Sequence, residues 1–365
     1  MRILYDGQIY EMQFSGGINR YFANLISKLP ADFTPALTTR QPQNVYSPTH
    51  PRLKTFYYKR FGFRPGRVSY ALEKSYFSAV DFFYSFDLIH PTYYSLLNLP
   101  EISQCRYPIV LTVWDMIHEL FAEKMDPNGQ VAEMKRKAVL SAQAIICISE
   151  NTKKDLLEVY SVPEEKVSVT HLASEIDASF SHCSEPVPSR PYYLYVGGRF
   201  SYKNFDGLLA AFAKAVSVRP EIALCVVGSP FNETEKKLIA DLKLTDRIEH
   251  YKHASDSHLA KLYRCSLALV YPSLYEGFGI PPLEAMSCGT AVVASNCSSI
   301  PEVVGDAGIL FDPKSVGDLA DILLFLLDNS VERDRLIAKG YRRAQTFSWD
   351  KTAAQTIDVY RSLIG

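Results

Sequence analysis

The sequence has no long hydrophobic run and no paired cysteines, and both absences narrow the class of protein. No apolar stretch approaches the ~18–20 residues of a membrane-spanning helix. The seven cysteines are scattered singly, without any Cys-x-x-Cys, which argues against a disulfide framework and against a zinc site. The net charge is only −1, so no global field attracts nucleic acid. With an opening Arg2-Ile3-Leu4-Tyr5 that does not resemble a signal peptide, these features predict a cytoplasmic protein.

The chain is long enough for two domains. At 365 residues it exceeds the usual size of one domain, and strand-like and helix-like segments alternate along it, which predicts an α/β protein with parallel sheets. Prolines and serines cluster in residues 179–191, which we expect to link a domain of residues 1–178 to one of residues 192–346. A final helical segment occupies 347–365.

The most informative stretch is 271–302. An apolar strand ends at Pro272, and a glycine-containing loop follows it. Pro281 and Pro282 suit the first turn of a helix, and Gly289 suits the position just after its end. A second short strand precedes Ser299-Ile-Pro-Glu302, which we expect to form a capping box at the next helix.

Two strand–loop–helix units in succession bring two helix N-termini to one edge of a sheet, where free N–H groups attract phosphate. Glu276 lies in the first loop and Glu284 inside the first helix. Carboxylates beside an anion site make sense if the ligand also carries hydroxyl groups, because an ionised carboxylate only accepts hydrogen bonds. A nucleotide sugar has this layout. The alternative is that both acids merely favour the helix dipole.

This stretch resembles the signature of the retaining glycosyltransferases of family 4. The resemblance implies the GT-B fold, in which two Rossmann-like domains with parallel sheets face a central cleft and the last helix crosses back to the N-terminal, acceptor-binding domain. It also implies that Glu276 contacts the donor sugar near the reacting carbon and that Glu284 holds the ribose hydroxyls. The same donor site would include Phe278, Gly279 and Ile280.

A second motif, residues 197–204, supports the resemblance. Arg199 and Lys203 follow a glycine pair and are four residues apart, so both can converge on one anion. The alternative is two solvated surface charges. Family members use an Arg and a Lys at this spacing on the donor diphosphate, which places Gly198, Arg199 and Lys203 in the donor site.

A glycine pair also follows the first strand. Gly16 and Gly17 precede a helical pattern, but the spacing is not Gly-x-Gly-x-x-Gly, and a plain tight turn is the alternative. Family members have a Gly-Gly-x-x-Arg pattern here that faces the donor diphosphate. The resemblance therefore assigns both glycines to substrate binding and extends to Arg20.

Two histidines lie where strands of the first domain end. His90 follows one strand, and Asp115 and His118 follow another, so all three are candidates for acceptor binding or proton handling. Many family members have a histidine directly before this aspartate, whereas this chain has Trp114. The role of that histidine therefore cannot be transferred directly, and Asp115 and His118 remain the catalytic candidates.

Acidic residues are absent from Phe33 to Leu72. The stretch carries seven basic residues among aromatic ones: Arg40, Arg52, Lys54, Lys59, Arg60, Arg64 and Arg67. Such a mixture suits an anionic surface with an apolar boundary, as at a lipid headgroup layer. The alternative is a solvated, irregular loop with buried aromatics.

The expected activity is transfer of a hexose, mannose or a related sugar, from a nucleoside diphosphate to a hydroxyl, with retention at the anomeric carbon. We expect same-face attack beside the departing phosphate, without metal or cofactor. The acceptor would be a glycan or a polyprenyl-diphosphate-linked glycan, in surface polysaccharide synthesis (O-antigen or capsule) at the inner membrane face. The alternatives are a GT-B nucleotide-sugar epimerase and a non-catalytic scaffold of that fold.

Overall fold

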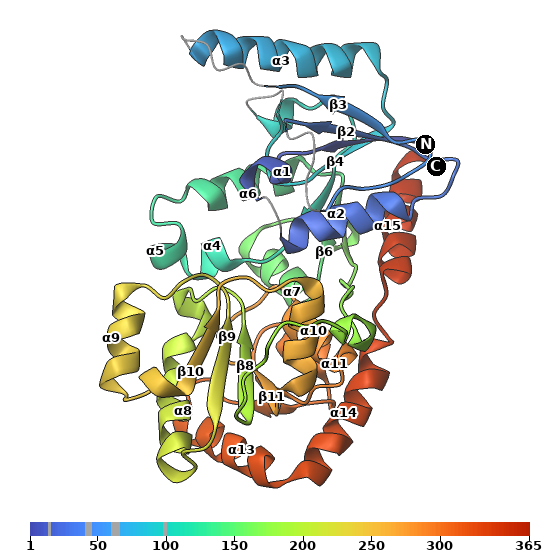
Figure 1. Ribbon diagram of the computed structural model, residues 1–365. Coiled ribbons are helices and arrows are strands. Elements are labelled where there is room, and N and C mark those ends of the chain that lie inside the picture. Colours follow the sequence, from blue (N-terminus) through green and yellow to red (C-terminus); the bar gives the residue numbers. More distant parts are fainter. Residues whose placement is uncertain (14–15, 41–45, 60–65, 98–100) are drawn as a thin grey trace. The chain divides into compact units, whose positions relative to one another are not determined.

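The computed structural model describes residues 1–13, 16–40, 46–59, 66–97 and 101–365, and of Gly66 and Arg67 only the backbone. The chain forms two compact units (Figure 1). The first contains residues 1–172 and 349–365, and the second contains residues 173–348. In the described parts of the chain, no helix combines the length and the apolar character that crossing a membrane requires.

The first unit is built on parallel strands. One sheet has the order β3-β2-β1-β4, another has the order β5-β6-β7, and a parallel bridge between Ile89 and Ile109 joins them. The strands are β1 (Arg2–Asp6), β2 (Thr34–Thr39), β3 (Lys54–Tyr57), β4 (Leu88–Pro91), β5 (Val110–Val113), β6 (Ala144–Cys147) and β7 (Val167–Val169). Strands β2 and β3 lie in the acid-free stretch, which is therefore not simply an irregular loop.

Helices on this unit begin where glycines or caps allow it. The predicted helix after Gly17 is confirmed, and its Tyr21 ring packs 5.0 Å from Trp114. Ser149 caps α7 through the N–H of Thr152. The helices are α1 (Ile9–Met12), α2 (Gly17–Ser27), α3 (Gly66–Phe83), α4 (Ile117–Leu120), α5 (Ala122–Met125), α6 (Gln130–Ser141), α7 (Glu150–Val159) and α15 (Trp349–Ile364).

The second unit has one six-stranded parallel sheet with the order β10-β9-β8-β11-β12-β13, and Figure 1 labels its strands β10, β9, β8 and β11. Its central strands are almost continuously apolar because helices cover both faces of a parallel sheet. The strands are β8 (Tyr192–Val196), β9 (Ala223–Val227), β10 (Ile248–Tyr251), β11 (Ala268–Tyr271), β12 (Val292–Ser295) and β13 (Ile309–Phe311).

The helices of the second unit pack their apolar faces on that sheet. Phe212 of α8 and Leu323 of α13 are fully buried in one cluster with Leu224 and Val270 of the strands. The helices are α8 (Phe205–Val218), α9 (Glu233–Asp241), α10 (Asp256–Cys265), α11 (Ile280–Ser287), α12 (Ile300–Val304), α13 (Val316–Asp328) and α14 (Ser330–Ala344).

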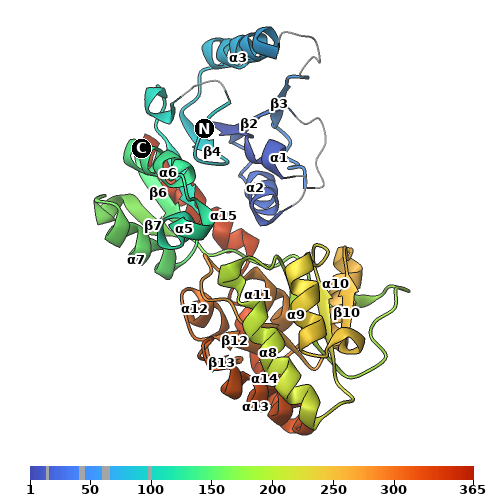
Figure 2. The same cartoon turned by 90° about the vertical axis from the view of Figure 1, so that its left-hand side faces the viewer.

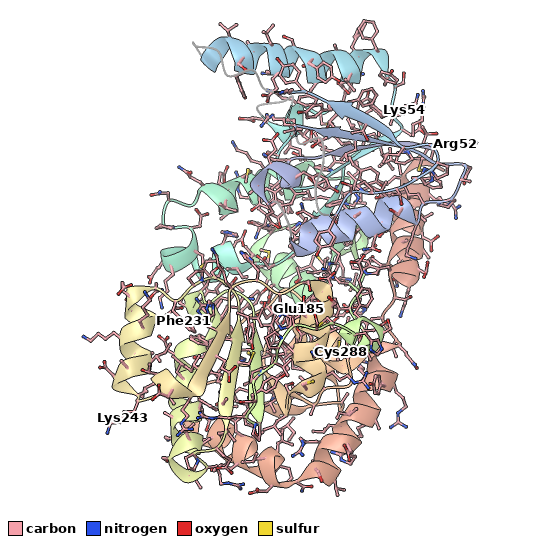
Figure 3. All side chains as sticks on the ribbon, viewed as in Figure 1. Arg52, Lys54, Glu185, Phe231, Lys243 and Cys288 are labelled. Atoms are coloured by element: carbon pink, nitrogen blue, oxygen red, sulfur yellow. The ribbon has the colours of Figure 1, made fainter. Side chains whose placement is uncertain are left out.

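Residues 173–191, which include the expected linker 179–191, belong to the second unit. Lys261 of α10 donates to the carbonyls of Cys183 (3.0 Å) and Glu185 (2.7 Å), and His258 Nε2 lies 2.9 Å from the carbonyl of Pro186. Figure 3 labels Glu185 beside α10. This proline-rich segment is thus packed against a helix.

Both strand orders are those of a Rossmann-like sheet. The order reverses between β1 and β4 in the first unit and between β8 and β11 in the second. Open α/β sheets bind ligands beyond the carboxyl ends of the strands at such reversals. In the second unit this rule selects the loops after β8 and β11, which carry the two motifs of the sequence.

Candidate active site

The loop after β11 is fixed between two helix starts. Gly279, at φ 135°, precedes α11, and Pro281 and Pro282 lie in the first turn, as predicted. Gly289 follows the end of α11 at φ 77°, where a Cβ atom would lie 2.1 Å from the hydroxyl of Tyr341. Only glycine fits this left-handed and crowded position.

The predicted capping box at Ser299 is wrong. Ser299 has helical dihedral angles (φ −76°, ψ −8°) and makes no side-chain cap at α12. Its Oγ lies 2.8 Å from the carbonyl oxygen of Glu276 and 2.6 Å from that of Phe278, to which its single proton can be donated. Ser298 Oγ accepts the N–H of Glu276 at 2.8 Å. The two serines hold the loop rather than the helix, because the loop carbonyls compete successfully for the hydroxyls.

Glu276 and Lys203 form an ion pair. Lys203 Nζ lies 2.7 and 2.8 Å from the two carboxylate oxygens of Glu276. The side chain of Lys203 is only 18% exposed, and that of Glu276 only 9%. Beneath them, burial and the charge of Glu276 raise the pKa of Tyr271 well above its ordinary value. Lys203, expected at the diphosphate, and Glu276, expected at the sugar, therefore form one largely desolvated ion pair.

Asn204 positions the loop that carries Lys203. It adopts a left-handed conformation (φ 53°), and its Nδ2 donates to the carbonyls of Pro313 (2.8 Å) and Pro272 (3.2 Å). The N–H of Leu274 also donates to the carbonyl of Tyr202 at 2.7 Å. These bonds tie the loop after β8 to the loop after β11 and so bring Lys203 to Glu276.

Arg199 has a different partner. Its Nε donates to Glu235 of α9 at 2.8 Å, and its Nη2 donates to the carbonyls of Ser229 (2.7 Å) and Pro230 (2.9 Å). The guanidinium lies 4.7 Å from the ring of Phe231, labelled in Figure 3. Nη1 is buried without a hydrogen-bond partner among the described residues. This preoriented cation thus keeps one unused donor group.

Nη1 faces a point where two loops touch. A Cβ atom added to Gly228 would lie 2.5 Å from the carbonyl oxygen of Gly197 and 3.4 Å from Nη1 of Arg199. Gly197 and Gly228, at φ 135° and 154°, end β8 and β9. The neighbouring Gly198 accepts a hydrogen bond from Tyr195 at 2.6 Å. Glycines thus let the backbone pass close to the guanidinium.

The two predicted substrate carboxylates have separate environments. Glu284 lies inside α11 and accepts a hydrogen bond from Tyr263 of α10 at 2.9 Å, with only 7% of the residue exposed. Ile280 begins α11, and Phe278 is buried against Phe347. Arg199 and Lys203, expected to share one anion, are each bound to a different carboxylate.

In the first unit, the glycine pair opens α2. Gly16 is extended (φ 178°), and an added Cβ atom would meet only the end of the flexible Gln13 side chain, so this position does not require glycine. Arg20 is buried, with its guanidinium 4.5 Å from the ring of Tyr46, to which it also donates a hydrogen bond. Its aromatic contact makes Arg20 part of the folded unit.

Asp115 and His118 lie on one short segment. Asp115 Oδ1 accepts the N–H of Ile117 at 3.0 Å and lies 3.8 Å from Nζ of Lys135. Lys135 is completely buried and donates at 2.8 Å to Glu119. His118 Nδ1 is buried without a hydrogen-bond partner among the described residues. The segment thus combines an imidazole that has an unused nitrogen with two carboxylates that share one buried lysine.

His90 is a structural residue. It is fully buried, with Nδ1 2.6 Å from the hydroxyl of Tyr360 and Nε2 2.8 Å from that of Thr112. Burial lowers its pKa to about 3. A neutral imidazole with both nitrogens occupied inside a core has no route to substrate, so the expectation that His90 is a site candidate is wrong.

The sequence matches two family models. Residues 15–174 match "Glycosyltransferase Family 4" and residues 182–343 match "Glycosyl transferases group 1". O-antigen chain mannosyltransferase B of Escherichia coli is 32% identical over 65% of this chain and 66% of its own length. An MMP α-(1→4)-mannosyltransferase of Mycolicibacterium hassiacum is 32% identical over 76% of this chain and 71% of its own. The chain belongs to glycosyltransferase family 4.

A solved structure supports the fold of this family-4 chain. Anabaena HepE, whose structure contains UDP and glucose, matches with a TM-score of 0.72 and 18% identity over 99% of this chain and 100% of its own. The predicted GT-B fold, with two Rossmann-like units and parallel sheets, is confirmed.

Trp114 takes the place of the histidine that many family-4 members have before this aspartate. Its indole is buried against Tyr21, and the backbone N–H of Trp114 donates to the hydroxyl of Tyr94 at 3.3 Å. Trp114 is therefore a core residue of the first unit.

Sequence reasoning missed the partners of the motif residues. Glu235 was not selected, although Asn232-x-x-Glu235 after a strand is a capping-box pattern, and the structure contains that box. Glu119 and Lys135 gave no signal, because their pairing joins segments that are distant in sequence. Ser298 was hidden within the motif itself.

Proposed function

We propose that this family-4 protein transfers a hexosyl residue, mannose foremost, from a nucleoside diphosphate to a hydroxyl of a glycan or polyprenyl-diphosphate-linked glycan, with retention and without a metal. The observation that carries the proposal is the Lys203–Glu276 pair at the strand reversal of the second unit. The mannosyltransferase relatives, one of them an O-antigen enzyme, support the sugar and the polysaccharide context.

The donor diphosphate would bind to the cations of the two loops. Lys203 has three N–H donors, and Glu276 occupies two of them in the described structure, which leaves one for a phosphate oxygen. Arg199 would offer the unused Nη1. Fixed cations in a poorly solvated site stabilise the charge that develops on a leaving phosphate without reorganising. Protein side chains would thus neutralise the diphosphate.

Glu276 would accept hydrogen bonds from the donor sugar while Glu284 accepts those of the ribose. The anomeric carbon–oxygen bond to the phosphate breaks as the acceptor oxygen attacks from the same face. The acceptor proton passes to the departing phosphate oxygen, so no protein base is needed at that step. Asp115 and His118 would position the acceptor hydroxyl for this attack.

A donor panel tests this proposal. The full chain is heated with single nucleotide sugars, GDP-mannose first, because a ligand that binds only the folded state raises the melting temperature. We expect one donor to stabilise the protein and to be consumed only with acceptor, in excess EDTA as well. The product should keep the anomeric configuration by NMR. An inverted product, metal dependence, or epimerisation of the donor without acceptor would contradict the proposal.

A further inference from the structure

Helix α3 is anchored to the first unit by one face. Its buried residues, Ser69, Glu73, Phe77 and Val80, recur at helical spacing. Glu73 is completely buried and forms an ion pair with Arg40, which directly follows β2. The Phe77 ring lies 6.3 Å from that of Tyr58, which follows β3. Figures 1 and 2 show α3 at the periphery of this unit, beside β3.

A second face of α3, which flanks the buried one, is apolar and exposed. Large side chains there are open to solvent, Leu72 to 49%, Phe82 to 73% and Phe83 to 77%. Along the helix this face contains Val68, Leu72, Ser75, Ala79, Phe82 and Phe83, none of them charged. Apolar side chains gathered on one exposed face mark a surface that contacts a partner or a membrane.

The exposed charged side chains that border this face are cationic. The two acids of α3 are already paired with arginines, Glu73 with Arg40 and Asp81 with Arg106 at 3.6 Å. Arg52, Lys54 and Lys59 are exposed. Lys54 Nζ lies 5.1 Å from the ring of Tyr84, just beyond α3, and Figure 3 labels Arg52 and Lys54 at the start of β3. The apolar face therefore has cations at its border.

We propose that the exposed face of α3 docks on an anionic lipid bilayer. Phe82, Phe83 and Leu72 would enter the boundary between headgroups and acyl chains, and Arg52, Lys54 and Lys59 would contact lipid phosphates. An interfacial helix has this division between an apolar face and cationic surroundings. Complementary charge favours an anionic membrane over a protein surface of mixed sign. The proposal concerns binding alone and does not depend on the sugar-transfer chemistry.

In this proposal only part of the acid-free stretch contacts lipid. Arg40, one of the seven basic residues of the stretch, forms ion pairs with Glu11 and Glu73. Its side chain is only 16% exposed, so it cannot contact a membrane. Arg60 and Arg64 lie outside the described residues, as does the side chain of Arg67. The apolar anchor comes from α3, which begins inside the stretch at Gly66 and continues beyond it to Phe83.

Vesicle sedimentation tests the docking. The full chain is mixed with vesicles of phosphatidylcholine alone or with phosphatidylglycerol added. We expect wild type to pellet with the anionic vesicles only, and less at 1 M salt, where the Debye length falls to about 3 Å. The triple variant Leu72→Ser/Phe82→Ser/Phe83→Ser should lose at least nine-tenths of that pelleting. The matched control Phe325→Ser/Val331→Ser removes exposed apolar side chains of the second unit and should pellet like wild type.

Insertion is distinguished from surface adhesion by fluorescence. Phe83→Trp should show a blue-shifted emission with anionic vesicles, whereas Phe325→Trp should not. Melting curves check that each variant is folded, and transfer to a soluble acceptor is measured separately. Equal pelleting of the triple variant, no pelleting of wild type, or an unshifted Phe83→Trp would overturn the proposal. So would a wild-type oligomer that the triple variant dissociates without any vesicle binding.

Discussion

At the scale of single residues, the site is a set of charges that are already paired. Lys203 binds Glu276, and Arg199 binds Glu235. Removing one member of a buried pair leaves the other charge uncompensated, which costs about 3–5 kcal/mol. Substitutions in the site should therefore be chosen to separate loss of binding from loss of folding.

Glu235 should position Arg199 for the donor. Replacing Glu235 by Gln keeps its size but removes the charge that orients the guanidinium, so we expect the Kd of the bare nucleoside diphosphate to rise about tenfold, worth about 1.4 kcal/mol. Calorimetric titration measures it. Glu233→Gln is the control, because Glu233 lies on the same helix, is 89% exposed and pairs with Lys236. Unchanged diphosphate affinity in Glu235→Gln would show that Arg199 needs no such support.

His90 should make the fold sensitive to acid. Its pKa is about 3 in the folded protein and 6.5 ordinarily, so between these values the unfolded chain binds a proton that the folded protein does not. Stability should therefore fall as the pH falls, by about 1.4 kcal/mol per pH unit within that window. Asp6, whose pKa burial raises to about 7, acts in the opposite direction.

The His90 contribution is isolated by comparing wild type with His90→Gln in urea unfolding at several pH values. The destabilisation caused by the substitution should shrink as the pH falls from 7 to 4.5, because only wild type loses the His90 contribution. A destabilisation that is constant across this range would mean that His90 does not titrate as its burial requires.

At the scale of elements, the sequence motifs predicted the right loops but not their internal bonds. The helix starts at Gly17 and Ile280 and the helix end before Gly289 follow from local conformational preferences, which neighbouring residues determine. The bonds of Ser299 to Glu276 and Phe278 depend on two loops meeting, and no local rule contains that. For the same reason the capping-box prediction failed at Ser299, whereas the purely local pattern Asn232-x-x-Glu235 does form a capping box.

Asn204 should show how much the loop geometry depends on one amide. Asn204→Gly keeps the left-handed conformation and loses the bonds to Pro272 and Pro313, whereas Asn204→Ala also adds backbone strain of about 1–2 kcal/mol. We expect both variants to bind donor more weakly and Asn204→Ala to melt at the lower temperature. Equal melting temperatures would indicate that the backbone at residue 204 relaxes in the alanine variant. Unchanged donor binding would show that the position of Lys203 does not depend on the Asn204 amide.

At the scale of the whole molecule, alternation of strands and helices predicted two Rossmann-like units because each parallel strand needs a covering helix. The donor-side candidates Arg199, Lys203 and Glu276 lie on two loops of the second unit, where the strand order reverses. The first unit was less predictable. Its acid-free stretch forms two strands and the first part of α3, whose anchor, the Arg40–Glu73 pair, joins distant segments. His90 was proposed as a site residue because its burial depends on tertiary packing, which the local sequence does not show.

The central claim is that Lys203 holds the donor diphosphate while Glu276 holds the donor sugar. The decisive measurement is the Kd of the bare nucleoside diphosphate, with turnover measured in parallel, for Lys203→Ala and Glu276→Gln. Lys236→Ala is the control, since Lys236 is 58% exposed and forms a comparable ion pair with Glu233 on the surface of the same unit.

The account predicts that Lys203→Ala weakens diphosphate binding at least tenfold, which is about 1.4 kcal/mol or more. Glu276→Gln should bind the diphosphate as well as wild type or better, because a nearby negative charge is gone, yet lose at least 99% of turnover. Diphosphate affinity unchanged in Lys203→Ala, or near-normal turnover in Glu276→Gln, would contradict the assignment of this pair to the donor.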